Sequence, residues 1–162
     1  MSPMSFRELT PEQVVMLAID VEEANGNRLR IFSDLFADYA PEAAEIFSEM
    51  AAEEDLHRGR LEAVYERRHG ELQRTVGEAD VRDVIEPHDL DDAEHVVFDS
   101  LSVRRALEVV LAAEHQALAF YRQAQENTDE RDLRELYREL ADFEAVHVRR
   151  IQAKLDALEG SA

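Results

Sequence analysis

Apolar side chains recur every three or four residues along four long stretches of this chain. This spacing keeps them on one face of an α-helix, so the pattern predicts helices over residues 10–38, 41–69, 102–126 and 130–158. Short turns separate the first helix from the second and the third from the fourth. Each pair is therefore expected to form an antiparallel hairpin.

Local sequence features mark the ends of these helices. Thr10 is a capping residue and is followed by a proline at the first helical position. Pro41 opens the second helix, and Gly70 is placed to stop it. The turn before the fourth helix is predicted at Asn127, Thr128 and Asp129.

Polar residues interrupt each apolar stripe near its middle. The second and fourth stripes each contain a Glu-x-x-His pair, and the first and third each contain a single glutamate. A glutamate buried beside a histidine needs a partner, and a metal ion is a partner that both can share. The candidate metal ligands are Glu22, Glu54, His57, Glu114, Glu144 and His147.

The two hairpins have the character of an internal repeat. In the first, Glu22 and Glu54 are 32 residues apart, and in the second Glu114 and Glu144 are 30 residues apart. Scattered polar residues rarely repeat one constellation at matching separations. The repeat therefore favours a common site at the centre of a helix bundle.

A third pair, Glu66 and His69, shows that the motif alone is weak evidence, because 23 of the 162 residues are glutamate. It follows the first pair by twelve residues, which is about 120° around the helix, and it directly precedes Gly70. We interpret it as part of the surface and of the helix C-terminus. The remaining histidines fall outside the stripes and are assigned no role: His88, His95 and His115.

Composition narrows the class of protein. A length of 162 residues suits a single domain over residues 1–162. The absence of cysteine excludes disulfides, thiolate zinc sites and iron–sulfur clusters. The net charge of −19 disfavours nucleic acid as a partner and suits cations, although a well-solvated surface explains it equally well.

The uninterrupted apolar runs, such as residues 14–19 and 109–113, are far short of a membrane span. Residues 1–10 lack the apolar core of a signal peptide. We therefore expect a soluble, cytoplasmic protein.

Residues 71–100 lie between the two hairpins and are the least readable part of the sequence. Their number is sufficient to cross the length of a bundle, as a ferritin-type crossover requires. Residues 80–85 are compatible with a short helix that Pro87 would break. The predicted fold is an all-α, ferritin-like antiparallel four-helix bundle, made of two hairpins joined by a long crossover.

Burial of the candidate ligands creates a charge problem. Four glutamates carry a charge of −4, which two divalent cations would neutralise. An unpaired buried charge costs several kcal/mol, whereas a whole domain is stable by only about 5–15 kcal/mol. Metal ions, protons or water must therefore compensate for the charge of the buried glutamates. The alternative to a metal site is a protonated or solvated cluster that only specifies packing.

At these residues the chain resembles the rubrerythrin or erythrin branch of the ferritin-like superfamily. Residues 50–70 are most similar to the erythrin domain of membrane-bound ferritin-like proteins, whose membrane part has no counterpart here. The Cys-x-x-Cys rubredoxin domain of full rubrerythrins is also missing, so no built-in electron relay is expected. The matching segments are residues 18–23, 50–57, 113–121 and 143–147.

The resemblance implies a role for each candidate ligand. It implies that Glu54 and Glu144 bridge the two metals. By the same resemblance, His57 and His147 each bind one metal, and Glu22 and Glu114 are terminal ligands. Rubrerythrins often carry a further glutamate one turn after the third-helix ligand, where this chain has Ala117. This departure weighs against peroxidase-type ligand switching. Tyr121 either bonds a ligand carboxylate or is an ordinary core residue, and a contribution from Glu23 is left open.

The implied function is binding of two Fe(II) ions and their oxidation by dioxygen or hydrogen peroxide, as a ferroxidase or peroxide scavenger in iron homeostasis. Manganese or zinc could occupy the same ligands. One alternative is a non-catalytic iron-binding or sensing module that delivers metal to a partner. Another is a bundle that uses its acidic surface for protein contacts. The resemblance and the long connection also predict a homodimer, with exchanged hairpins as one form of it.

Overall fold

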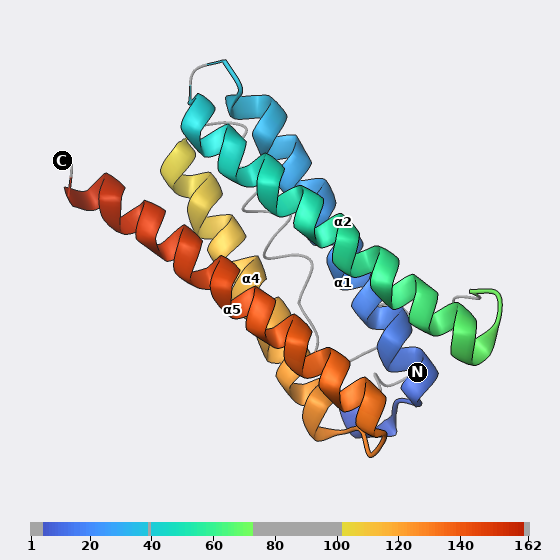
Figure 1. The fold of residues 1–162 in the computed structure, drawn as a ribbon. Helices are drawn as coiled ribbons and strands as arrows, with labels where there is room; N and C mark the ends of the chain where they lie inside the picture. The colour runs from blue at the N-terminus through green and yellow to red at the C-terminus, as the bar shows by residue number, and fades with distance from the viewer. Residues whose placement is uncertain (1–4, 39, 73–101, 161–162) are drawn as a thin grey trace.

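The computed structural model describes residues 5–38, 40–72 and 102–160, and these form four long α-helices (Figure 1). A short 3-10 turn precedes them, and the elements in chain order are η1 (Phe6–Glu8), α1 (Pro11–Phe36), α2 (Pro41–His69), α4 (Val103–Glu126) and α5 (Arg131–Gly160). The predicted all-α class and the positions of the helices are confirmed. Helix α1 ends two residues earlier than expected, and α5 continues two residues further. The expected helix at residues 80–85 lies outside the described residues.

The predicted helix ends are formed by the expected contacts. The Thr10 hydroxyl accepts a 3.1 Å hydrogen bond from the Gln13 backbone, and the Gln13 side chain accepts one of 3.0 Å from the Thr10 backbone. This reciprocal pair satisfies two N–H groups at the start of α1. Gly70 ends α2 with a φ of 81°, a left-handed conformation that glycine adopts without strain. None of the described helices has the length and apolar character required to cross a membrane.

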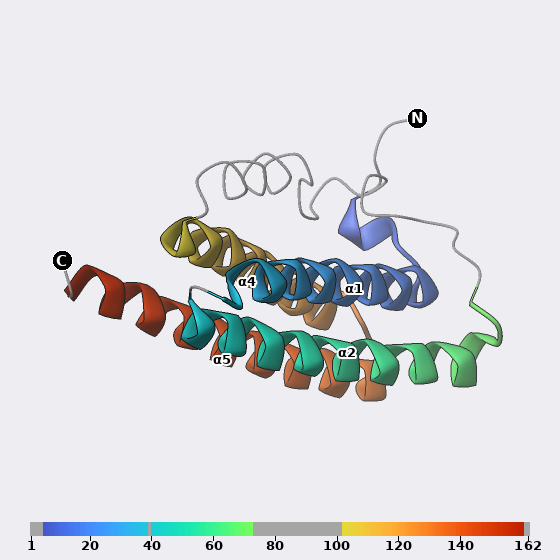
Figure 2. The same ribbon diagram turned by 90° about the horizontal axis from the view of Figure 1, so that it is seen from above.

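The helices are arranged as two hairpins in two layers. Helix α1 packs along α2, α4 packs along α5, and α1 also contacts α4. Seen from above, α1 and α4 form one layer, and α2 and α5 form the other (Figure 2). Helix α2 ends and α4 begins at opposite ends of the bundle (Figure 1), so the connection between the hairpins must link those ends. This is the ferritin-like topology expected from the sequence.

Ion pairs join the two hairpins along the interface between α2 and α5. The pairs run nearly the length of these helices and are Lys154 with Glu42 at 3.6 Å, Arg150 with Glu49, Arg60 with Glu139 and Arg68 with Glu130. Each has at least one largely exposed partner, and such pairs contribute only about 0–1 kcal/mol apiece. The hairpins are therefore held together chiefly by what is buried between them.

The described residues bury two apolar clusters, one in each half of the bundle. The first includes Ile19, Leu61 and Tyr137. The second includes Phe32 and Phe47, whose ring centroids are 5.8 Å apart. Between the clusters lies a polar layer formed by the six candidate ligands, which we call the Glu/His cluster. The fold thus places these residues at the centre of the molecule.

Candidate metal centre

All four helices contribute to the Glu/His cluster. Each member lies in the apolar stripe of its own helix, so the packing that buries the stripe also buries the polar residue. Helix α1 supplies one glutamate, α4 supplies one, and α2 and α5 each supply a Glu-x-x-His pair. These residues are between 0% and 6% exposed, and the full set is Glu22, Glu54, His57, Glu114, Glu144 and His147. The structure thus brings together all six residues singled out from the sequence.

One half of the cluster is arranged around His147. Its Nδ1 atom lies 2.9 Å from an oxygen of Glu54, 3.4 Å from one of Glu114 and 3.5 Å from one of Glu144. The four residues come from three helices, and their closest donor atoms lie within 4.8 Å of one another. A single cation could contact all of them.

The other half is arranged around His57. Its Nδ1 atom lies 3.7 Å from Glu22 Oε2, and donor atoms of Glu54 and Glu144 complete a second group within the same 4.8 Å limit. Glu54 and Glu144 therefore belong to both groups. The two imidazole rings are stacked, with centroids 6.3 Å apart. This geometry can hold two cations side by side with shared carboxylates.

Burial changes the acid–base behaviour of these residues. It raises the pKa of Glu54 well above the ordinary value, and the charge of Glu22 raises it further. Burial likewise raises the pKa of Glu144, with the charge of Glu114 as the next cause. Without cations, the shared carboxylates therefore tend to retain protons.

Glu22 and His147 respond differently to the same environment. Burial alone would raise the pKa of Glu22, but the neighbouring Glu54 and His57 side chains lower it overall. Burial alone would lower the pKa of His147, but its hydrogen bond to Glu114 and the other nearby carboxylates raise it above the ordinary value. Without cations, Glu22 and His147 thus favour their charged forms, whereas Glu54 and Glu144 favour their neutral forms.

Several buried atoms of the cluster lack a hydrogen-bond partner among the described residues. An unsatisfied buried polar group costs about 1–3 kcal/mol, so such a concentration calls for a bound partner. Carboxylate and imidazole donors suit iron, manganese and zinc. The unpartnered atoms are Glu22 Oε2, both carboxylate oxygens of Glu54 and of Glu144, and His57 Nδ1. The residues therefore fit a pair of divalent cations.

Two residues next to the cluster contact it directly. The Tyr121 hydroxyl donates a 2.5 Å hydrogen bond to Glu22 Oε1, a contact that the sequence left open. Burial raises the pKa of Tyr121, so the hydroxyl remains a donor. Glu53 was not expected from the sequence, and its Oε2 atom lies 2.6 Å from His147 Nε2. Its only sequence signal is its position immediately before Glu54.

The remaining candidates from the sequence do not join the cluster. His69 and His115 are exposed, and His88 and His95 lie outside the described residues. Ala117 is fully buried in the first apolar cluster.

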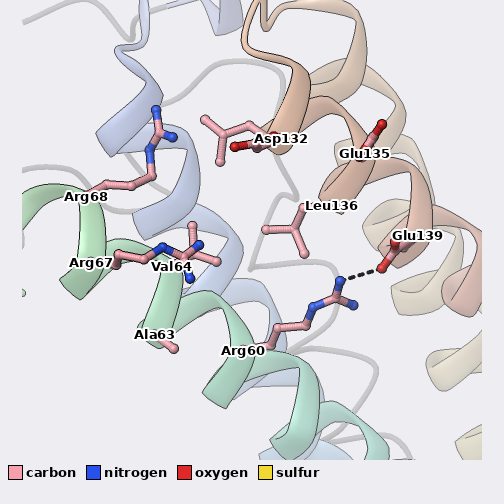
Figure 3. Close-up of a pocket in the computed structure, with 10 residues that line it drawn as sticks. Arg60, Ala63, Val64, Arg67, Arg68, Asp132, Glu135, Leu136 and Glu139 are labelled. Atoms are coloured by element: carbon pink, nitrogen blue, oxygen red, sulfur yellow. Dashed lines mark hydrogen bonds and ion pairs between the residues drawn. The ribbon is translucent and has the colours of Figure 1, made fainter.

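A hollow of about 400 Å³ lies between the second half of α2 and the first half of α5. Figure 3 shows arginines on α2 facing acidic residues on α5, with Arg60 paired to Glu139. The lining also includes apolar side chains such as Val64 and Leu136. No member of the Glu/His cluster lines this hollow, so it is a separate feature of the surface.

The family model described as Rubrerythrin matches residues 13–155 of this chain. The matched span contains the whole Glu/His cluster and reaches from α1 into α5. No curated protein matches the chain.

Solved structures with the same fold include the following two proteins. An uncharacterized conserved protein from Magnetospirillum magnetotacticum MS-1 has a TM-score of 0.73 and 22% identity, with 92% of this chain and 95% of that chain covered. A hypothetical protein from Pyrococcus furiosus has a TM-score of 0.69 and 19% identity, with 96% and 94% covered. At these identities the likeness concerns the fold alone.

Proposed function

This chain belongs to the rubrerythrin family, and from that premise we propose that it binds two Fe(II) ions and oxidises them with dioxygen or hydrogen peroxide. The observation that carries the proposal is the Glu/His cluster, in which two four-residue groups share Glu54 and Glu144. Shared carboxylates between two metal positions are what a di-iron centre requires.

In the proposed centre, Glu54 and Glu144 would serve both metals, because they belong to both groups of donor atoms. One metal would be held in addition by residues of the first hairpin, Glu22 and His57, and the other by Glu114 and His147. Four carboxylates and two divalent cations give a site with no net charge. This balance removes the cost of burying the carboxylates in an apolar interior.

The protein residues prepare and isolate the centre. Bound iron would supply the electrons that pass to the oxidant. Tyr121 holds Glu22 by its hydrogen bond, and the two apolar clusters on either side limit access of water. Glu54 and Glu144 release protons when cations bind, because metal and proton compete for the same oxygens.

Anaerobic loading followed by exposure to oxidant tests the proposal. Metal-free protein is mixed with increasing Fe(II), and air or hydrogen peroxide is then added while ferric absorbance is followed by stopped flow. Oxidation should be much faster than for the same Fe(II) in buffer and should saturate at two ions per chain. Glu54→Gln combined with Glu144→Gln should abolish this phase, and His69→Ala should retain it. No binding of iron would overturn the proposal.

The second candidate is a non-catalytic module that binds or senses iron and passes it to a partner. The observation that favours it is Ala117, a buried apolar residue at the position where rubrerythrins often carry a further glutamate. Two Fe(II) bound tightly but oxidised no faster than in buffer would select this candidate.

A further inference from the structure

The residue that precedes the bridging glutamate differs between the two hairpins. In the first hairpin this residue is Glu53, and in the second it is Phe143. Each lies on the interface between α2 and α5 and contacts the histidine of the opposite hairpin. Glu53 contacts His147, and Phe143 contacts His57. The internal repeat is therefore broken at one pair of equivalent positions beside the cluster.

The contact with Glu53 determines which ring nitrogen of His147 carries the proton when the imidazole is neutral. Its carboxylate oxygen lies 2.6 Å from Nε2, on the opposite side of the ring from the Nδ1 atom that faces the cluster. A neutral imidazole has one N–H and one lone pair. With the proton of Nε2 donated to Glu53, the lone pair of Nδ1 is directed at the metal position. Arg150 lies 3.9 Å from the other oxygen of Glu53.

The environment of His57 lacks this support. Its ring centroid lies 4.8 Å from that of Phe143, with the planes inclined by 45°. A phenyl ring packs against the imidazole but offers no carboxylate to accept its proton. Among the described residues, the carboxylate within ion-pair distance of His57 is that of Glu22, on the metal side of the ring. On the side of the ring away from the metal position, His147 therefore has a carboxylate partner, whereas His57 has a phenyl ring.

We propose that Glu53 is a positioning residue for His147, and that it makes the two metal positions unequal. This inference rests on the proposed function. A carboxylate that accepts the second N–H of a metal-bound imidazole orients the ring and increases its donor strength, and loss of such a partner lowers metal affinity about 10–100-fold. The position at His147 therefore fills first, and the position at His57 binds more weakly and exchanges more readily.

Calorimetric titration of the metal-free full chain with Zn²⁺ tests the order of filling. The native protein should bind one ion tightly and a second at least tenfold more weakly, within the range that such partners produce. Glu53→Leu should weaken the tight step about 10–100-fold. Glu53→Gln keeps an acceptor oxygen and should restore part of the loss. Glu49→Gln is the matched control, because Glu49 pairs with Arg150 and should change neither step.

The reciprocal substitution provides a gain-of-function test. Phe143→Glu places a carboxylate beside His57 and should strengthen the weak step, whereas Phe143→Leu should not. Because Phe143 is 45% exposed, this position tolerates a polar side chain. In the zinc-loaded protein, ¹⁵N-labelled histidine should show a slowly exchanging Nε2 proton on His147 that Glu53→Leu releases.

The outcomes separate this inference from the function on which it rests. Failure of the native protein to bind zinc or iron would overturn both. Binding of two ions with equal affinity, or a tight step that survives Glu53→Leu, would overturn the role of Glu53 and leave the di-metal centre intact.

Discussion

Tyr121 on α4 donates a 2.5 Å hydrogen bond to the Oε1 atom of Glu22 on α1. Both side chains are fully buried, and the two helices belong to different hairpins. The exposed ion pairs between α2 and α5 join the same hairpins at the surface. The tyrosine therefore joins the hairpins inside the protein and positions a candidate ligand at the same time.

Substitution of Tyr121 should lower the free energy of unfolding. In Tyr121→Phe the Glu22 carboxylate loses a donor, and a hydrogen bond to a charged group is worth about 1.5–3 kcal/mol. We expect a loss of this size in the free energy of unfolding of the metal-free protein, measured by urea denaturation. Tyr137→Phe is the matched control, because its buried hydroxyl has no hydrogen-bond partner among the described residues. Equal losses in both variants would mean that the Tyr121 bond is not stabilising.

Metal binding should depend on the two histidines of the cluster. His57→Ala combined with His147→Ala removes one nitrogen donor from each proposed metal position and should abolish tight binding of two ions per chain. His69→Ala removes an exposed histidine from the third Glu-x-x-His pair and should bind as the native protein does. Metal content after gel filtration is the measurement. Equal loss in the His69 variant would mean that the wrong pairs were chosen.

The stability of the metal-free protein should fall as the pH rises from about 5 to 7. Burial raises the pKa of Glu54 and of Glu144 above the ordinary 4.5, so the folded chain retains protons that the unfolded chain releases. Fewer protons on the unfolded state make stability decrease with increasing pH. The raised pKa of His147 acts in the same direction.

Metal should therefore stabilise the protein more at pH 7 than at pH 5. A ligand in hundredfold excess over its Kd adds about 2.7 kcal/mol, and protons compete for its donors at low pH. Thermal melts with EDTA and with Zn²⁺ at both pH values measure the gap. Glu54→Gln with Glu144→Gln should raise the Tm of the metal-free protein at pH 7 and remove the response to metal. An unchanged Tm on metal addition at pH 7 would argue against the di-metal centre.

The protein should also self-associate. Helices α2 and α5 expose large apolar side chains, among them Leu56 at 74% and Val146 at 48%. Together with the family resemblance, these favour a homodimer. Light scattering at micromolar concentration should give twice the mass of the chain, and Leu56→Arg with Val146→Arg should shift it toward the monomer. Ile31→Arg, an exposed apolar position on α1, is the control. A monomeric native protein would contradict the prediction.

Helical periodicity was sufficient to predict the fold and the membership of the Glu/His cluster. The stripe containing Glu144 and His147 is buried along its length. As expected, Thr10 caps the start of α1 and Gly70 caps the end of α2. These features are local, because each depends on residues within one helix. The same pattern correctly separated His69, which is exposed, from His57, which is buried.

The contacts that the sequence could not supply all cross between hairpins. Glu53 lies on the edge of the α2 stripe, where an acidic residue is ordinarily solvated, and only the placement of α5 brings His147 to it. The partner of the Tyr121 hydroxyl is set in the same way by the packing of α4 on α1. Periodicity identifies the buried face of a helix but not the atom that lies opposite it. The crossover predicted at residues 71–100 falls almost entirely outside the described residues.

The position of the Glu/His cluster between two apolar clusters has a consequence for folding specificity. If one hairpin slid along the other by a single turn, about 5.4 Å, Glu144 could face the apolar Met50, which lies one turn before Glu54 on α2. An entirely apolar bundle would tolerate such a slip, because one leucine can replace another. We expect that leucines at all six positions would raise the Tm but broaden the amide resonances, as several alignments interconvert. The layer that weakens the metal-free bundle would then be what gives it a single alignment.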